Sequence, residues 1–369
     1  MLLALAEMRR ARARFGLLIA AVALLVFLIL AQQALRDGLI RAFVGAIERQ
    51  SAPVLVYAVD GQRTLQGSVI TPELEGRIAR VAGVAATGRI GQGTFTVVVG
   101  GGERSDAALI GYTDAALGGP EGLAGGRMPR GPGEAVGSAE DYAPGDVVRV
   151  TGDGPALRVV GVAEGARIQV TPTLFVRWDD YAAASRAANP DARTVLPSAI
   201  GVRPEDGVTP GEVAARINAA SDEADALTRA DAAELTPGVA EVRRSFDLIF
   251  ALFALVVPLV TGLFFLIVTL QKSRSLTLLR AIGASPGVLV RALLVQVLVV
   301  TGGGVLVGTL AYVPLSQARL GDLALRFDPV SVVFWAALLI GLGVVSAVAA
   351  ARRVLAIDPV EATGGGGAR

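Results

Sequence analysis

Four long stretches without a charged residue most constrain what this chain can fold into. They are Phe15–Ala34, Leu248–Leu270, Ala292–Ala318 and Pro329–Ala351. Each reaches or exceeds the roughly 20 apolar residues that a helix needs to cross a bilayer. An ionised side chain near mid-membrane costs about 2.5–3.5 kcal/mol on insertion scales, so several such windows in one chain are not expected by chance. The pattern predicts an integral membrane protein.

We predict an α-helical membrane domain of four transmembrane helices, with an α+β extracytoplasmic domain inserted between the first and the second. The predicted segments are a cytoplasmic N-terminal segment (1–14), helix 1 (15–35), an extracytoplasmic α+β domain with stalks (36–246), helix 2 (247–270), a cytoplasmic helix (271–287), helix 3 (288–313), a short extracytoplasmic loop (314–328), helix 4 (329–351) and a cytoplasmic tail (352–369).

Basic residues predict the orientation in the membrane. They precede the first span, lie between the second and third, and follow the fourth: Arg9, Arg10, Arg12 and Arg14; Lys272, Arg274, Arg280 and Arg291; Arg352 and Arg353. The positive-inside rule places both termini and the loop 271–287 in the cytoplasm. A bias toward Arg, Ala, Gly and Val is typical of a GC-rich bacterial genome. We therefore expect a multi-pass protein of the bacterial cytoplasmic (inner) membrane.

The first span also has features of a secretory signal, because a basic start precedes its apolar run. The run is too long for a typical signal core, and no clear small-x-small cleavage site follows before Gln32 and Gln33. We therefore interpret this segment as an uncleaved anchor.

Composition removes several functional classes. The chain has no histidine and no cysteine, so the commonest metal ligand, the commonest general base and disulfides are all absent. The formal net charge of +1 gives no global field for nucleic acid, and none is expected as a partner. No catalytic residue and no metal site are predicted.

ATP hydrolysis by a P-loop is excluded as well. Such a loop needs glycines followed by Lys and Ser or Thr, but the only lysine, Lys272, has no glycine pattern before it. No span carries a buried acid or base, which argues against proton-coupled transport. The carboxylates of the inserted domain show no distinctive pairing, and we expect solvated surface for them: Glu121, Glu134, Glu140, Asp141, Asp179 and Asp180.

The inserted domain has mixed secondary-structure signals. β-branched runs bounded by turn residues predict strands at Val54–Val59, Thr94–Val99, Asp146–Val150, Leu157–Val162, Arg167–Trp178 and Ser198–Val202. Helices are predicted at Pro72–Val81, Asp179–Ala188 and Pro210–Ala220, and a loop at Gly118–Gly133. Two arrangements fit the sequence equally well. In one, the domain stands on helical stalks at Arg36–Gln50 and Glu241–Phe250; in the other, it is an ordinary domain tethered by loops.

The cytoplasmic segment from Lys272 to Pro286 is the most specific motif. Leu276, Leu279 and Gly283 fall on one side of a short helix that Gly283 and Pro286 end. Arg274 and Arg280 can face lipid phosphates or an acidic partner. Read by itself, this is an amphipathic cytoplasmic helix, and a simple interfacial connector between two spans is the alternative.

The sequence closely resembles the FtsX/MacB-type permease family, the membrane subunits of type VII ABC transporters. Three features carry the resemblance: the one-plus-three span layout, the phrase 278–285 (LLRAIGAS) and the tail 357–362 (IDPVEA). The resemblance implies that the loop between spans two and three is a coupling helix that docks in a groove of a separate ATPase. Arg274, Leu276, Leu279, Arg280, Ile282 and Gly283 are the expected ATPase-coupling residues.

Two departures from the family pattern concern the cytoplasmic pieces. Ser275 stands where members often have an acidic residue, which puts one polar contact with the ATPase in doubt. The tail ends in Gly364–Gly367 rather than Leu-Arg.

The start of the chain, 5–10 and 14–17, is similar to the haem-exporter and DevC-like branch. Without histidine, haem would need Tyr, carboxylate or Met ligands, and Met128 is the only methionine of the inserted domain.

The membrane spans also carry signals of helix packing and of assembly. Gly304 and Gly308 form a small-xxx-small pair that permits close helix packing, although general glycine richness is the alternative. Four spans offer too little wall to enclose a solute path. With the resemblance, this implies two permease copies, as a homodimer in membrane lipid, working with two ATPase copies that hold ATP and Mg. No cofactor is expected in this chain itself.

The predicted function is that of a non-catalytic permease subunit. Hydrolysis of ATP by the partner would move the extracytoplasmic domain and so export or extract a hydrophobic or amphipathic substrate, such as haem, a lipid, a peptide or a drug. The alternative is a signal transmitter that transports nothing and instead regulates an extracytoplasmic cell-wall hydrolase.

Overall fold

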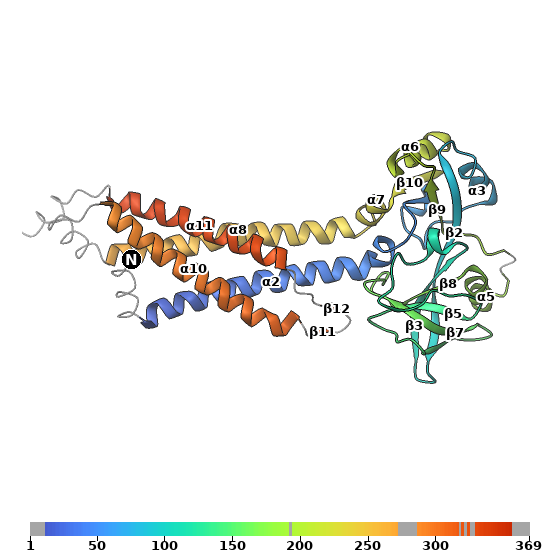
Figure 1. Ribbon diagram of the computed structural model, residues 1–369, viewed down its shortest axis with the longest axis horizontal. Coiled ribbons are helices and arrows are strands. Elements are labelled where there is room, and N and C mark those ends of the chain that lie inside the picture. Colours follow the sequence, from blue (N-terminus) through green and yellow to red (C-terminus); the bar gives the residue numbers. More distant parts are fainter. Residues whose placement is uncertain are drawn as a thin grey trace, which may run out of the picture. The chain divides into compact units, whose positions relative to one another are not determined.

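The computed structural model describes residues 12–191, 194–271, 286–316, 319–320, 323–324 and 329–355. The chain divides into two compact units (Figure 1). The lobe comprises Asp37–Arg243, and the helical unit comprises the described residues up to Arg36 and most of the chain from Arg244 onward. Two helices, α2 (Arg12–Glu48) and α8 (Val239–Gln271), contribute residues to both units.

The helical unit is built from four long helices. Besides α2 and α8 it contains α10 (Pro286–Ser316) and α11 (Pro329–Leu355). Between α10 and α11, the short strands β11 (Arg319–Leu320) and β12 (Leu323–Ala324) form a two-stranded sheet.

Length and composition alone mark two helices of the described chain as able to cross a membrane, Phe15–Glu48 and Leu294–Leu315. A shorter apolar helix covers Val332–Leu342. The predicted total of four crossings therefore stays a prediction.

An exposed apolar face on α8 shows which surroundings this helix suits. Leu248, Leu252, Leu255, Leu259 and Leu263 recur at helical spacing and are 55–75% exposed. A contiguous apolar face of this kind is rare on soluble proteins and typical of a surface that meets another apolar phase. The hydrocarbon of a bilayer would cover it.

The lobe is organised around a ten-stranded mixed sheet. Its order is β10-β1-β9-β2-β3-β8-β5-β7-β4, with β6 pairing to β2 and β7. The strands are β1 (Val54–Ala58), β2 (Val84–Val99), β3 (Arg104–Tyr112), β4 (Gly125–Gly126), β5 (Glu134–Ser138), β6 (Val147–Val150), β7 (Ala156–Ala163), β8 (Thr173–Arg177), β9 (Ala199–Pro204) and β10 (Ala224–Thr228). Among the strand pairs of the described residues, β3–β8 and β5–β7 are parallel.

Strand β2 joins the two parts of this sheet. Its first half pairs with β9, and its second half pairs with β3 and β6. At the middle, Gly91 lies opposite Gly111 of β3, and a Cβ on either would fall within 2.3 Å of the Tyr181 side chain. The two glycines therefore leave the space into which the Tyr181 ring packs against the sheet.

Short helices cover the lobe sheet, and local side chains cap four of the six. They are η1 (Val59–Gly61), α3 (Pro72–Ile78), α4 (Ala115–Gly118), α5 (Trp178–Ala188), α6 (Pro210–Ala220) and α7 (Arg229–Glu234). The Leu74 N–H donates to the Thr71 hydroxyl over 3.2 Å at the start of α3. Thr209 and Glu212 form a capping box at α6, which satisfies two otherwise unpaired backbone donors.

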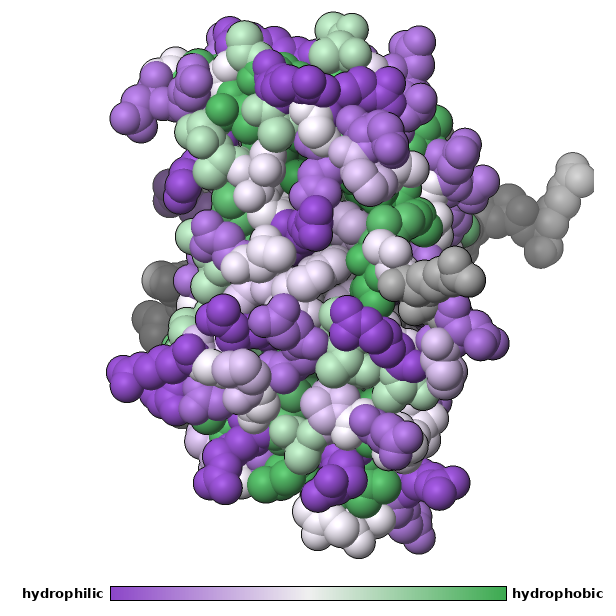
Figure 2. Space-filling model, turned by 90° about the vertical axis from the view of Figure 1, so that its right-hand side faces the viewer, coloured by the Kyte–Doolittle hydropathy of each residue, from purple (hydrophilic) through white to green (hydrophobic). Residues whose placement is uncertain are grey.

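The lobe surface differs from that of α8. Figure 2 looks onto one face of the lobe and shows hydrophobic side chains as small separate groups among hydrophilic ones. Among the described residues of the lobe, the exposed large hydrophobic side chains are scattered: Val59, Val69, Val147 and Leu235. This is the surface expected of a domain that stands in water.

The α+β class predicted for the lobe is confirmed. The predicted strand at residues 54–59 is β1, the hairpin predicted at 146–162 is β6–β7, and the three predicted helices are α3, α5 and α6. Four strands were missed: β3, β4, β5 and β10, of which β4 lies within the segment 118–133 that was predicted as a loop. The predicted strand at 167–178 was too long, because only Thr173–Arg177 is extended.

Candidate functional site

The predicted ATPase-coupling residues lie outside the described residues. They belong to the stretch between the end of α8 at Gln271 and the start of α10 at Pro286. The roles of Arg274, Leu276, Leu279, Arg280, Ile282 and Gly283 therefore stay predictions. The functional geometry that the structure does describe concerns the helices that lead away from this stretch.

Glycines of α10 face α2 within the helical unit. A Cβ on Gly304 would lie 2.4 Å from Val22 Cγ1, and one on Gly308 would lie 2.5 Å from the Ala23 carbonyl oxygen. A Cβ on Gly302, by contrast, would meet nothing within 4 Å. Side chains larger than hydrogen do not fit at Gly304 and Gly308 without a shift of α2. We call this contact the α2–α10 seam.

The last turns of α2 are enclosed by a loop of the lobe, residues 165–171. The Ala46 N–H donates to the Arg167 carbonyl over 2.8 Å, and the Val170 N–H donates to the Ala42 carbonyl over 2.7 Å. The Gln169 N–H donates to the Phe43 carbonyl over 3.0 Å. Backbone groups near the end of a helix often bond to side chains or water, and here a loop takes that place. We call this arrangement the α2 anchor.

Close packing and a buried ion pair hold the α2 anchor in place. A Cβ on Gly45 would lie 2.1 Å from the Gly165 carbonyl oxygen, so only glycine allows the loop to reach the helix. Arg167 of this loop forms a buried ion pair with Asp141, with the Arg167 Nε 2.7 Å from a carboxylate oxygen. The Ser138 hydroxyl donates to the same carboxylate. Because hydrogen bonds, close packing and the ion pair all hold this loop, we expect it to move together with α2.

Apolar contacts tie both long helices to one core of the lobe. Val44 and Ile47 of α2 are buried in a cluster that also contains Leu55, Tyr57 and Val239, the first residue of α8. Two connections from the helical unit thus end in the same hydrophobic core. A displacement of either helix end has to be absorbed by that core or passed on to the sheet, because packed interiors compress little.

A cavity of about 190 Å³ lies beside the α2 anchor. Its lining combines apolar and polar side chains: Phe43, Ile47, Arg63, Thr64, Leu65, Gln66, Gln92, Ile168, Gln169, Thr236 and Pro237. Gln92 is 6% exposed, and neither atom of its carboxamide has a hydrogen-bond partner within the described part of the chain. A small polar group that both donates and accepts would satisfy this amide.

Two turns with left-handed backbone border that cavity. Gln62 and Arg63 have φ of 48° and 61°, and Gln169 and Val170 have φ of 50° and 64°. A β-branched residue such as Val170 is rarely found there, since its branched Cβ crowds the backbone. The strain falls within the loop of the α2 anchor, next to the hydrogen bond from Val170 to Ala42.

Several carboxylates of the lobe have structural partners. Within the described residues, no group of three or more His, Cys, Asp or Glu side chains is placed to hold a metal ion. The expectation of solvated surface was wrong for Asp141, which is in the buried ion pair, and for Asp180, which is buried and accepts from the Gly133 N–H over 3.0 Å. Burial raises the pKa of Asp180.

Glu134 is a structural carboxylate as well. Its ion pair with Arg127 and the backbone N–H of Arg130 lower its pKa to about 2. A carboxyl group in this state stays ionised at neutral pH and is a poor general acid. The sequence had predicted neither this pair nor the α2 anchor. The isolated Gly45 inside a helical pattern was the one available signal of close backbone packing.

Comparisons with known families cover most of the chain. Residues 15–220 match the model of the MacB-like periplasmic core domain, and residues 248–359 match that of the FtsX-like permease C-terminal domain. The first of these alone spans more than half of the chain.

Solved structures of two related domains resemble part of the chain. The periplasmic region of MacB from Actinobacillus actinomycetemcomitans is 12% identical, with 49% of this chain and 92% of that chain covered and a TM-score of 0.35. The extracellular domain of the ABC-type transporter YknZ from Gram-positive bacteria is 16% identical, with 47% and 99% covered and a TM-score of 0.32. Since both TM-scores are low, the family assignment rests on the two sequence models.

Proposed function

Because this chain belongs to the FtsX/MacB-type permease family, the membrane subunits of type VII ABC transporters, we propose that it converts ATP hydrolysis by a separate subunit into motion of its lobe. The lobe is its MacB-like extracytoplasmic α+β domain. In this proposal the chain performs no chemistry itself, and the ATPase subunit holds ATP and Mg. The coupling helix at 271–287 would receive the force.

The α2 anchor is the observation that carries this proposal. A single helix, α2, begins in the helical unit, and its last turns are bonded into the lobe by three backbone hydrogen bonds. A second contact of α2, the α2–α10 seam, joins it to the helix that follows the predicted coupling segment. Force applied at residues 271–287 would therefore pass to α8 and α10, then to α2, and from α2 into the lobe core.

The assembly that we propose contains two permease copies and two ATPase copies. A homodimer with a pair of ATPases would let nucleotide-driven closure act on both coupling segments at once. We further propose that both termini are cytoplasmic, that the chain lies in the bacterial inner membrane, and that the moving lobe exports or extracts a hydrophobic or amphipathic substrate. The polar lobe surface and the apolar face of α8 support work at the boundary between water and lipid.

The test is a charge-reversing change in the coupling segment. Leu279→Asp combined with Arg280→Glu should abolish co-purification of the partner ABC ATPase co-expressed with this chain, because an apolar contact and a cation are both lost. A matched variant, Leu355→Asp with Arg352→Glu, makes the same two changes near the other cytoplasmic end and should retain the ATPase.

Two outcomes of that experiment contradict the proposal. One is normal ATPase binding by the coupling-segment variant. The other is loss of ATPase binding by both variants, which would point to general damage rather than to a docking surface. Circular dichroism of each purified variant shows whether helix content is kept.

A further inference from the structure

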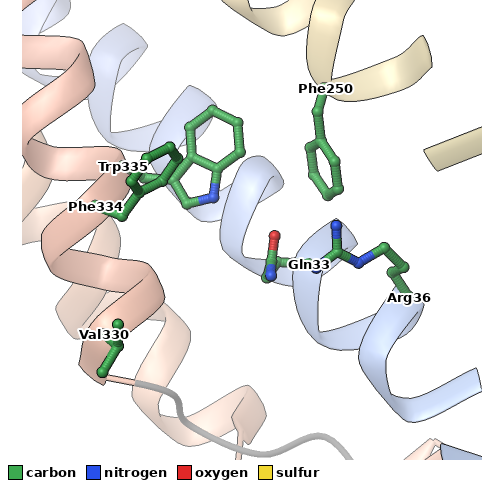
Figure 3. Close-up of a pocket in the computed structure, with 6 residues that line it drawn as sticks. All are labelled: Gln33, Arg36, Phe250, Val330, Phe334 and Trp335. Carbon is green, nitrogen blue, oxygen red and sulfur yellow. The ribbon is translucent and has the colours of Figure 1, made fainter. Parts of the chain in front are cut away.

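The helical unit contains a cavity of about 350 Å³ that the proposed coupling does not use (Figure 3). It is lined by Gln33 and Arg36 of α2, Phe250 of α8, and Val330, Phe334 and Trp335 of α11. Its volume lies at the lower end of the range of ligand pockets, roughly 300–1,000 Å³. It suits the part of an amphiphile next to its head group rather than a whole two-chain lipid.

The residues that line this cavity lie at the same end of the apolar run in each of the three helices. Arg36 follows the charge-free run of α2, Phe250 comes shortly after Asp247 at the start of the apolar run of α8, and Val330 is in the first turn of α11. In the predicted topology this is the extracytoplasmic end. Trp335 lies about 9 Å along α11 from Pro329, a depth at which aromatic side chains favour the membrane–water interface.

Among the described residues that line the cavity, Arg36 is the one with a charged side chain. Its guanidinium carbon lies 5.3 Å from the centre of the Phe250 ring, toward which it points in Figure 3. One of its nitrogens is 3.9 Å from the carboxylate of Asp247, which is itself 63% exposed. A contact this long and this exposed is weak. A phosphate can bind a guanidinium through two parallel hydrogen bonds, which is a stronger arrangement.

Aromatic rings form the opposite wall. Trp335 is buried, with its ring centre 5.4 Å from that of Phe250 and 5.6 Å from that of Phe334. Phe334 and Val330, by contrast, are largely exposed, so this wall continues onto the outer surface of α11. In a bilayer that surface meets the acyl chains. A lipid can therefore reach the cavity from the side without leaving the membrane.

We propose that this cavity binds one anionic phospholipid of the outer leaflet, whose phosphate group Arg36 holds while Trp335 and Phe334 pack against the glycerol and upper acyl chain. The positive charge of Arg36 favours an anionic lipid, and the aromatic wall sets how deep in the membrane that lipid lies. The proposal does not depend on the ATPase partner, and it goes beyond the transmission of force.

Trp335 makes this site directly measurable, because the chain has only two tryptophans and the other, Trp178, is in the lobe. The full chain with Trp178→Phe is reconstituted into phosphatidylcholine vesicles that contain a small fraction of lipid brominated on the upper acyl chain. Bromine quenches tryptophan fluorescence on contact. Brominated phosphatidylglycerol should compete for the site about fivefold better than brominated phosphatidylcholine, given about 1 kcal/mol per basic residue.

Variants separate the site from general attraction to the membrane. Arg36→Gln should remove the preference, so that both brominated lipids quench equally. Asp247→Asn should increase it, because a carboxylate that lies beside Arg36 is gone. Arg41→Gln, a change of the same kind on the same helix but outside the cavity, should leave the fivefold preference in place.

Equal quenching by the two brominated lipids in the unaltered cavity would overturn the proposal. So would a preference that survives Arg36→Gln or that Arg41→Gln removes. If Arg36→Gln fails to fold, Asp247→Asn decides: an unchanged preference contradicts the proposal. Neither ATP nor the ATPase is present, so a failure of the proposed function leaves this measurement unaffected.

Discussion

At the residue scale, glycine controls how closely α2 can approach its neighbours. Gly45 in the α2 anchor and Gly308 in the α2–α10 seam both face backbone oxygen atoms. Backbone cannot rotate away as the end of a flexible side chain can. A single methyl group at either position therefore has to displace a helix or a loop.

We predict that Gly45→Ala destabilises the lobe by about 1–3 kcal/mol, the usual range for overpacking. The physical reason is the 2.1 Å approach of the new Cβ to the Gly165 carbonyl oxygen. The free energy of unfolding can be measured in detergent on the full chain with Trp335→Phe, so that the fluorescence of Trp178 alone reports on the lobe. Gly211→Ala is the control, since a Cβ in that part of α6 meets nothing within 4 Å. Equal effects of the two changes would count against the anchor.

Glu134 should make lobe stability depend on pH. Its pKa is about 2 in the folded lobe and ordinarily 4.5, so the folded state favours the ionised form. The stabilisation is present above about pH 4.5 and is lost as pH falls toward 2. Thermal unfolding at pH 6 and pH 3 should therefore differ less in Glu134→Gln than in the unaltered chain.

Arg127→Gln removes the partner of Glu134 and should reduce the same pH difference. A pH difference of undiminished size in both variants would show that other carboxyl groups cause it. If the ion pair causes the pH difference, the double variant should reduce that difference no further than either single change does, because both changes act on one ion pair.

At the scale of elements, sequence patterns predicted those parts that local chemistry decides. The Thr71 cap followed by Pro72 predicts α3, and alternation around Gly152–Gly154 predicts the β6–β7 hairpin. The class of the lobe followed from such elements. These signals succeed because capping and turn formation involve residues close together in the chain.

Elements that depend on distant partners were missed for a physical reason. The first half of β2 contains Gly88, which lowers its strand propensity, yet β9 pairs with this half and supplies the hydrogen bonds. The α2 anchor needs Gly45 and Gly165 to meet across the fold. No local pattern encodes such a meeting, so the candidate site was only partly predictable.

The α2–α10 seam gives a prediction for whole helices. The chain lacks cysteine, so Ile19→Cys with Gly303→Cys introduces the only disulfide that can form within it. A Cβ on Gly303 would lie 3.6 Å from Ile19 Cδ1, so the two positions are close. Oxidation should cross-link this pair efficiently. Adding Gly308→Val should lower the yield several-fold, because the new side chain pushes α2 away.

Gly302→Val is the matched control for the seam. A Cβ at Gly302 meets nothing within 4 Å, so cross-linking should stay near the level of the parent pair. If Gly308→Val leaves the yield unchanged, or Gly302→Val lowers it equally, α2 and α10 do not pack through these glycines.

At the scale of the whole molecule, two units share two helices. The helical unit offers lipid an apolar face on α8, and the lobe offers water a polar surface. Only α2 and α8 carry the chain from one compact unit into the other within residues 12–271, apart from the two residues not described. If the lobe responds to ATP, these two helices are the expected route.

The most direct test of this account is a spin-label distance between the units, measured in the assembly with its ATPase. Labels at Asp153→Cys in the lobe and Val333→Cys on α11 report on the separation. ATP should shift the distance distribution. Three glycines inserted after Arg36 and three after Arg243 should abolish that shift while ATP hydrolysis continues. A shift that survives both insertions, or no response to ATP in the chain without insertions, would contradict transmission through α2 and α8.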